Sequence, residues 1–181
     1  MTRPIGIYEK ATPKNFTWRE RLAFAKELGF DFVEMSVDES DSRLARLDWT
    51  KKERLDVVQA IYETGIRIPS ICFSGHRRYP LGSNDPKTEA TSLEMMKKCI
   101  ELAQDLGVRT IQLAGYDVYY EEKSPATRAR FIKNLRKACD WAEEAQVILA
   151  IEIMDDPFLN SIEKYLAVEK EIDSPYLFVY P

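Results

Sequence analysis

The sequence has 181 residues and a formal net charge of −4, with 45% hydrophobic and 31% charged residues. Acidic and basic residues are interspersed, which argues against the basic face that nucleic-acid or anionic-membrane binding needs. No stretch is long and apolar enough to span a membrane, and we read no signal peptide, so we expect a cytoplasmic protein without nucleic-acid or membrane partners.

The predicted elements begin with a short apolar strand over residues 5–10. A unit of amphipathic helix, turn and apolar strand then occurs four times, with strands at residues 31–37, 67–74, 109–116 and 148–155. Gly29, Gly65 and Gly107 follow the first three helices, at a position where the chain adopts a left-handed conformation. Gln146 stands there in the fourth unit, so that turn costs more or takes another shape.

The sequence also indicates where helices begin and which helix faces are buried. Thr50 with Glu53 forms a capping box, and Ser124-Pro125 places a cap residue before a proline that suits the first helical turn. Apolar residues recur at helical spacing within 93–103 and 131–142, and we interpret both stripes as core.

A last apolar run at residues 176–181 gives six strands with a helix in each of the five gaps. Such alternation predicts a parallel sheet with right-handed crossovers in an α/β protein. A barrel of eight such units takes about 250 residues, so the sequence accommodates about six of them. We therefore predict that residues 1–181 form a single, incomplete (β/α)8 TIM-barrel domain, truncated after about strand six.

The three cysteines are odd in number and far apart, at positions 72, 99 and 139. They form neither a disulfide framework nor a CxxC metal motif, so we expect buried free thiols in a reducing compartment.

Chemistry in a parallel α/β barrel lies at the carboxyl ends of the strands, and polar residues occur at each predicted end. Glu152 interrupts an apolar strand, where a carboxylate is heavily desolvated unless it is paired or bound to a metal. It could bind a hard cation, act as a base with a raised pKa, or form an ion pair with a neighbouring Arg or Lys. Glu34 breaks another apolar strand, as a substrate-binding group or as a buried structural acid.

The loop after the third strand contains His76, the only histidine, followed by Arg77 and Arg78. We predict that His76 and Arg77 offer ring and guanidinium nitrogens to a sugar hydroxyl or phosphate at the barrel mouth, although basic pairs in loops are often merely solvated. Tyr116, with Tyr119 and Tyr120, either walls the pocket and stacks on a sugar face or packs within its own loop.

These segments resemble a known family. IGIYEKA, GFDFVEMSVDESDSRLARLDW, IPSICFSGHRRYPLGS, RTIQLAGYDVYYEE and AIEIMD are similar to the bacterial L-ribulose-5-phosphate 3-epimerases, also called L-xylulose-5-phosphate 3-epimerases, of L-ascorbate and pentose catabolism. The resemblance runs from Ile5 to the last residue. It implies a xylose-isomerase-like barrel, a small phosphorylated ketose as substrate, and a homodimer.

The resemblance also implies a divalent metal (Mn, Mg, Zn or Co) held by a Glu on strand five, an Asp after strand six, a His on strand seven and a Glu on strand eight. The two glutamates of that set move the C3 proton of the substrate. Glu152 alone has a counterpart in this sequence, as catalytic residue and metal ligand. We therefore expect the 181-residue chain to bind metal poorly and to be inactive alone.

Other functions stay open. A hexulose-6-phosphate isomerase uses similar proton chemistry on a different carbon, and a non-catalytic sugar-phosphate-binding or interaction fragment would need no complete site. An abasic-site endonuclease needs several histidines and a basic face, which one His and a net charge of −4 exclude.

Overall fold

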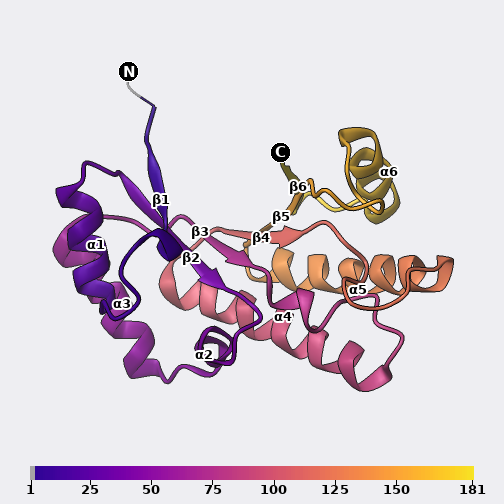
Figure 1. Ribbon diagram of the computed structural model, residues 1–181, viewed down its shortest axis with the longest axis horizontal. Helices are drawn as coiled ribbons and strands as arrows, with labels where there is room; N and C mark the ends of the chain where they lie inside the picture. The colour runs from indigo at the N-terminus through magenta and orange to yellow at the C-terminus, as the bar shows by residue number, and fades with distance from the viewer. Residues whose placement is uncertain (1–2) are drawn as a thin grey trace.

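The computed structural model describes residues 3–181 and shows one six-stranded parallel sheet with its strands in chain order. The strands are β1 (Gly6–Tyr8), β2 (Phe32–Val37), β3 (Ser70–Phe73), β4 (Thr110–Ala114), β5 (Ile148–Glu152) and β6 (Leu177–Tyr180). The long helices are α1 (Trp18–Glu27), α3 (Lys51–Thr64), α4 (Pro86–Leu106), α5 (Pro125–Glu144) and α6 (Ile162–Ile172) (Figure 1). The predicted alternation of strand and helix is confirmed.

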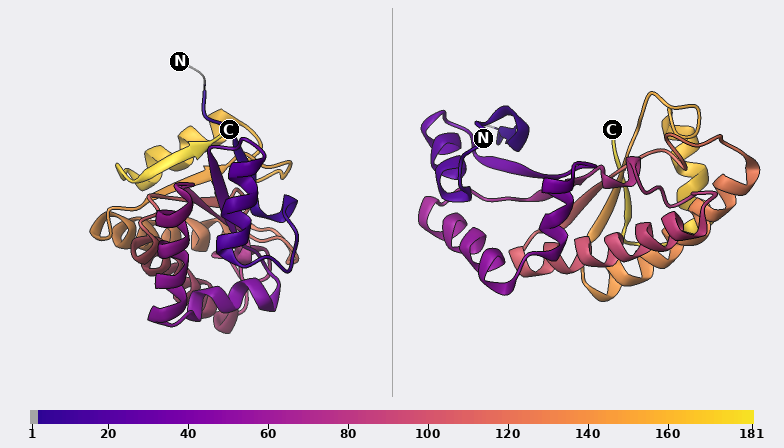
Figure 2. Two further views of the ribbon diagram at one scale, coloured as in Figure 1. Left: turned by 90° about the vertical axis from the view of Figure 1, so that its left-hand side faces the viewer. Right: turned by 60° about the horizontal axis from the view of Figure 1, so that its bottom comes forward.

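Each long helix packs beside the next, and together they form a curved outer layer around the sheet (Figure 2). The helices α1 and α6 lie at the two ends of this arc (Figure 1). Short elements follow the strand ends: η1 (Glu9–Ala11), α2 (Asp41–Leu44), η2 (Ala45–Asp48) and η3 (Gly75–Arg77). The chain thus forms an open part of a barrel, with one strand face turned to the helices and the other inward.

Alternation along each strand separates these two faces. In β5, Leu149 and Ile151 are fully buried in the core beneath the helices. Glu152 therefore projects to the inner side, as do Gln112 and Ala114 of the neighbouring β4, since Ala114 is the register partner of Glu152. The inner face is where a barrel enzyme binds its ligand.

The turns that end the helices occur where the sequence predicts them. Gly29, Gly65 and Gly107 have φ of 81°, 74° and 69°, the left-handed conformation that glycine adopts without strain. Gln146 has φ of 59° after α5, so the fourth unit keeps the turn shape and accepts the strain of a side chain there. The predicted caps at Thr50 and Ser124 are both present.

The predicted helical stripes lie in the core, for example Met96, Ile100 and Leu135. All three cysteines are free, two of them buried and Cys72 partly exposed on the inner face. In the part of the chain that the structure describes, no helix has both the length and the apolar character required to cross a bilayer.

Candidate active site

A cavity of about 430 Å³ lies at the carboxyl ends of the strands. Its lining comes from the end of β1, the loop after β2, β3 and its following loop, and the ends of β4 and β5. Five consecutive strand ends thus contribute to one concave site, as expected for a barrel. Among the predicted residues, the cavity brings together Glu152 and Arg77.

Glu152 is the last residue of β5 and lines this cavity. Burial raises the pKa of its carboxyl group, the negative charge of Glu34 raises it further, and the Gln112 side chain opposes the shift. No cation is among the groups that determine this pKa. The carboxylate faces inward and forms no ion pair with an Arg or Lys of residues 3–181, so it suits proton transfer or cation binding better than a structural ion pair.

Glu34 lies on the same inner face but does not line the cavity. It is the register partner of Tyr8 and accepts a hydrogen bond of 2.7 Å from the Ser70 hydroxyl. Glu34 acts on Glu152 through its charge, because it contributes to the raised pKa there.

The structure corrects the expected position of His76. Its ring is only 4% exposed, its Nε2 lies 3.3 Å from the Ser92 carbonyl oxygen of α4, and its centroid is 4.5 Å from that of Phe73. Burial lowers the pKa of His76 to about 4, opposed by the Ser92 carbonyl, so the ring is neutral. The η3 turn directs the imidazole into the helix layer, and His76 therefore does not line the cavity.

Arg77 and Tyr116 lie together at the rim. The Arg77 Cζ is 4.7 Å from the ring centroid of Tyr119, and the Tyr116 and Tyr119 rings are 5.2 Å apart. Tyr116 is 2% exposed; burial raises the pKa of its hydroxyl and the nearby Arg77 guanidinium opposes the shift, so Tyr116 packs behind Arg77. Arg78 points away and pairs with Asp41 at 2.6 Å.

Sequence reasoning missed the polar residues from β1 and the loop after β2. Lys10 and Asp38 both line the cavity and form an ion pair of 2.5 Å, and the Tyr8 hydroxyl donates to Ser36 at 2.9 Å. The sequence does place three polar residues, Tyr8-Glu9-Lys10, at the end of a predicted strand. It does not show which acidic residue pairs with Lys10.

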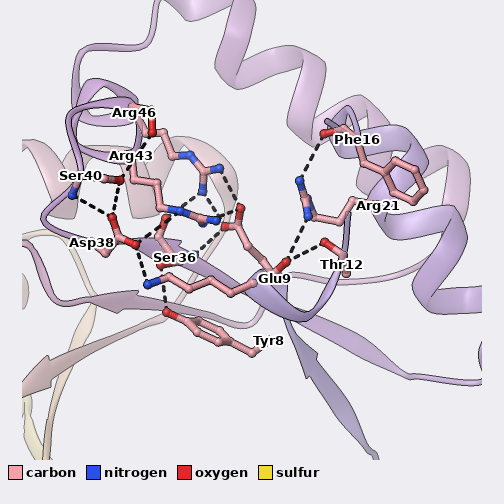
Figure 3. A network of polar contacts seen from close by, with 12 residues as sticks. Tyr8, Glu9, Thr12, Phe16, Arg21, Ser36, Asp38, Ser40, Arg43 and Arg46 are labelled. Carbon is pink, nitrogen blue, oxygen red and sulfur yellow. Dashed lines mark hydrogen bonds and ion pairs between the residues drawn. The ribbon is translucent and has the colours of Figure 1, made fainter. Parts of the chain in front are cut away.

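A buried ion cluster lies beneath this rim (Figure 3). Glu9 is fully buried, and its carboxylate contacts Arg43 at 2.7 Å, Arg46 at 2.6 Å and the Ser36 backbone N–H at 2.7 Å. The Arg21 guanidinium donates to the Glu9 carbonyl oxygen at 3.1 Å. The cluster ties the end of β1 to the loop after β2, and it thereby positions the Lys10–Asp38 side of the cavity.

The ends of β4 and β5 approach closely at Gly115. A Cβ at this position would lie 2.3 Å from the Glu152 backbone oxygen, which real contacts do not tolerate. We predict that Gly115→Ala lowers the free energy of unfolding by about 1–3 kcal/mol, because the strand ends must move apart. Urea unfolding measures the effect. An unchanged midpoint would show that the two strand ends separate freely.

A family model described as "Xylose isomerase-like TIM barrel" matches residues 22–181. The chain belongs to this family. The order of strands, the outer helix layer and the cavity at the strand ends agree with that membership.

Relatives in the family include the L-ribulose-5-phosphate 3-epimerase UlaE of Salmonella paratyphi B, which is 56% identical over 178 residues. The match covers 98% of this chain and 63% of that protein, so the chain spans less than two thirds of the relative's length. UlaE of Salmonella schwarzengrund matches with the same identity and coverage.

Among solved structures, a D-psicose 3-epimerase crystallised in the presence of D-fructose superposes with a TM-score of 0.82 at 16% identity, over 98% of this chain and 62% of that one. A xylose isomerase-like TIM barrel protein from Mycobacterium smegmatis, in complex with magnesium, gives a TM-score of 0.68 at 19% identity, over 98% and 64%. At these identities the likeness shows the fold.

The metal that the family resemblance implies can be tested against the side chains. Within residues 3–181, no group of three or more His, Cys, Asp or Glu side chains is placed to hold a metal ion. Glu152 offers one carboxylate of the hard-oxygen type that Mg²⁺ and Mn²⁺ accept, while Asp38 is already paired with Lys10. The described residues therefore do not form a metal site by themselves.

Proposed function

We propose that this chain provides strands one to six of a sugar-phosphate epimerase, which interconverts L-ribulose 5-phosphate and L-xylulose 5-phosphate by inversion at C3. Two findings support the proposal: the 56% identity to L-ribulose-5-phosphate 3-epimerases over 98% of the chain, and a cavity at the strand ends lined by Glu152, whose carboxylate has no ion-pair partner among residues 3–181.

The observation that carries the proposal is the state of Glu152. A C3 epimerase must remove a proton next to a ketone and return one to the opposite face. A carboxylate whose pKa is raised by burial is a stronger base than an exposed one. Its pKa is also shifted toward the operating pH, so the protonated form can return the proton. We assign Glu152 the proton transfer on one face of the substrate.

Inversion requires a second acid or base on the opposite face of the substrate. The other carboxylates that line the cavity, Asp38 and Glu39, are paired with Lys10 and Arg77. Residues 3–181 thus supply one proton-transfer group, and we expect the 181-residue chain to bind the ketose phosphate with little turnover.

We further propose Glu152 as one ligand of a divalent cation, Mn, Mg, Zn or Co, whose other ligands lie outside residues 3–181. We also assign three residues to substrate binding. Arg77 contacts the ligand, while Glu34 and Tyr116 support the inner wall and the rim of the cavity. We also propose a cytoplasmic homodimer, supported by three free thiols and by Phe178 on the edge strand β6, which is 50% exposed.

The test is proton exchange at C3. The 181-residue chain is incubated with L-ribulose 5-phosphate and Mn²⁺ or Mg²⁺ in heavy water, beside a chimera in which a UlaE relative supplies the part of the barrel that follows its matched region. We expect deuterium at C3 and L-xylulose 5-phosphate from the chimera, and little from the chain alone.

Exchange at C1 would instead show an aldose–ketose isomerase acting on a hexulose or pentulose phosphate. A chimera that binds the substrate without exchange would show a binding fragment. Robust turnover by the 181-residue chain would contradict the assignment of a single proton-transfer group to the described residues.

A further inference from the structure

We propose that Lys123 is a positioning residue: its ammonium group bridges the loops that follow β4 and β5, and this bridge fixes the cavity wall beside Glu152. The inference rests on the proposed function, because it concerns how the proton-transfer group of the same site is held in place. Lys123 does not line the cavity itself, so it acts on the reaction through the loop after β5.

Lys123 makes three polar contacts. Its Nζ lies 2.9 Å from Asp117 Oδ1, 2.5 Å from the Val118 carbonyl oxygen and 3.1 Å from Asp156 Oδ2. An ammonium group has three N–H donors, so these acceptors use its full capacity. Asp117 and Val118 belong to the loop after β4, as Lys123 does, whereas Asp156 belongs to the loop after β5. The contact with Asp156 is therefore the one that joins two loops.

The end of the bridge at β4 is firmly held. Asp117 is 2% exposed, and its Oδ2 accepts a hydrogen bond of 2.5 Å from the Thr127 hydroxyl in the first turn of α5. The Asp117 carbonyl oxygen also accepts a bond of 3.1 Å from the Gly82 N–H. The Lys123 and Asp156 side chains are 33% and 14% exposed, so solvent weakens their ion pair less than it weakens a surface pair. Lys123 can thus hold the second loop against a fixed point.

The other end of the bridge lies in a segment that follows β5 and is not part of the sheet. Within this segment, the Met154 N–H donates to the Leu159 carbonyl oxygen at 3.1 Å. The Phe158 N–H donates to Asp156 Oδ1 at 2.9 Å, so Asp156 uses one carboxylate oxygen inside the turn and the other on Lys123. A turn that is bonded within itself shifts as one unit, and its contacts with the neighbouring loops set its place.

Met154 connects this turn to the reaction. A single residue separates it from Glu152, and the Met154 and Glu152 side chains both line the cavity. A shift of the turn therefore moves the apolar wall near the carboxylate and reaches Glu152 itself through the backbone. Proton transfer is sensitive to such a shift, because a misplacement of about 1 Å can lower a rate about hundredfold.

Apolar contacts hold the far end of the same turn. Phe158 packs against Phe131 of α5 with 4.9 Å between the ring centroids, and Leu159 is fully buried. These contacts lie beyond Asp156, on the side away from Met154, and should keep the turn folded when the bridge is lost. We therefore expect the bridge to govern the placement of the turn more than the stability of the protein.

The experiment compares Lys123→Met and Asp156→Asn in the chimera described above. The amide of Asp156→Asn has one oxygen, which cannot accept from both Lys123 and the Phe158 N–H. We expect both variants to lower kcat for L-ribulose 5-phosphate about ten- to hundredfold and to leave KM within about threefold of the parent value. Asp155→Asn is the matched control, because Asp155 is the adjacent acid but is exposed and does not line the cavity.

Backbone amide hydrogen exchange in the 181-residue chain gives a second readout that needs no turnover. Lys123→Met should speed exchange across residues 153–159 and leave β4 unchanged, while Lys133→Met, which removes an exposed lysine of α5, should change neither. A merely structural role would lower the urea midpoint without changing kcat of the folded enzyme. If Lys123→Met does not fold, Asp156→Asn decides, because it leaves the contacts of Lys123 within its own loop in place.

Unchanged kcat in both Lys123→Met and Asp156→Asn would overturn the inference while the epimerase function stands. Equal losses in Asp155→Asn and Asp156→Asn would overturn it as well, since Asp155 has no part in the bridge. If the parent chimera shows no exchange at C3, the proposed function fails and amide exchange decides the bridge. Faster exchange across residues 153–159 in Lys123→Met then supports the bridge, and unchanged exchange overturns it.

Discussion

Replacing Glu152 by glutamine in the chimera is expected to reduce C3 proton exchange and epimerisation by about 10³-fold, the middle of the range for loss of a general acid or base. Glutamine keeps the shape and the hydrogen-bonding length of the side chain but can neither take nor return a proton. Turnover of L-ribulose 5-phosphate, followed by deuterium incorporation at C3, measures the loss. Undiminished turnover would remove Glu152 from the mechanism.

The same substitution should raise the free energy of unfolding by about 0.5–1 kcal/mol. Because burial raises the pKa of Glu152, the native chain ionises this carboxyl group less readily than the unfolded chain does. Its contribution to stability is present below the unfolded pKa and is lost as the pH rises through the raised native pKa. The stability advantage of Glu152→Gln should therefore grow across that interval, as urea unfolding at a series of pH values would show.

Asp155→Asn provides the matched control for both measurements. Asp155 lies three residues after Glu152, is exposed and does not line the cavity. Its replacement should change neither turnover nor the pH dependence of stability. A loss of activity in Asp155→Asn equal to that in Glu152→Gln would show that the loop as a whole, and not one carboxylate, is responsible.

The position of Glu152 on the inner face could be predicted because strand alternation has a period of two. Leu149 and Ile151 must face the helices, so Glu152 must face the barrel interior. The left-handed turns at Gly29, Gly65 and Gly107 were predictable for a similar reason, since helix ends have few conformations and glycine is suited to one of them.

The orientation of His76 could not be predicted in this way. It lies in the three-residue turn η3, where no periodicity assigns a face. Its direction is set by Ser92 of α4 and by Phe73, and the sequence does not say which helix covers the loop. The neighbouring arginines illustrate the same limit, because Arg77 reaches the cavity and Arg78 pairs with Asp41.

The Glu9 cluster was beyond sequence reasoning for another reason. Glu9 is 37 residues from Arg46, and nothing in the local pattern pairs them. Only the parallel pairing of β1 with β2 brings the end of the first strand beside the loop that follows the second. A charged residue directly after an apolar strand was visible, but its partners depend on the register of the sheet.

Replacing Glu9 by glutamine is expected to lower the free energy of unfolding by about 3–5 kcal/mol, the usual consequence of removing one partner from a buried ion cluster. The change leaves the half-buried Arg43 and Arg46 guanidinium groups without their shared carboxylate. Urea unfolding of the 181-residue chain measures the loss. Glu94→Gln is the matched control, because Glu94 forms an exposed pair of 3.8 Å with Lys98 and should contribute less than about 0.5 kcal/mol.

The pH dependence gives this prediction a second readout. Burial raises the pKa of Glu9, but Arg46, the Ser36 N–H and Arg43 outweigh burial, so the native pKa is lowered. The stabilisation is therefore present above the unfolded pKa and is lost as the pH falls through the native value, and Glu9→Gln should abolish that acid-side loss. Because the cluster ties the end of β2 and Asp38 of the following loop to Glu9, Glu9→Gln should also weaken binding of L-ribulose 5-phosphate under conditions where the variant remains folded. Unchanged binding in a destabilised variant would show that the cluster supports the fold without positioning the cavity.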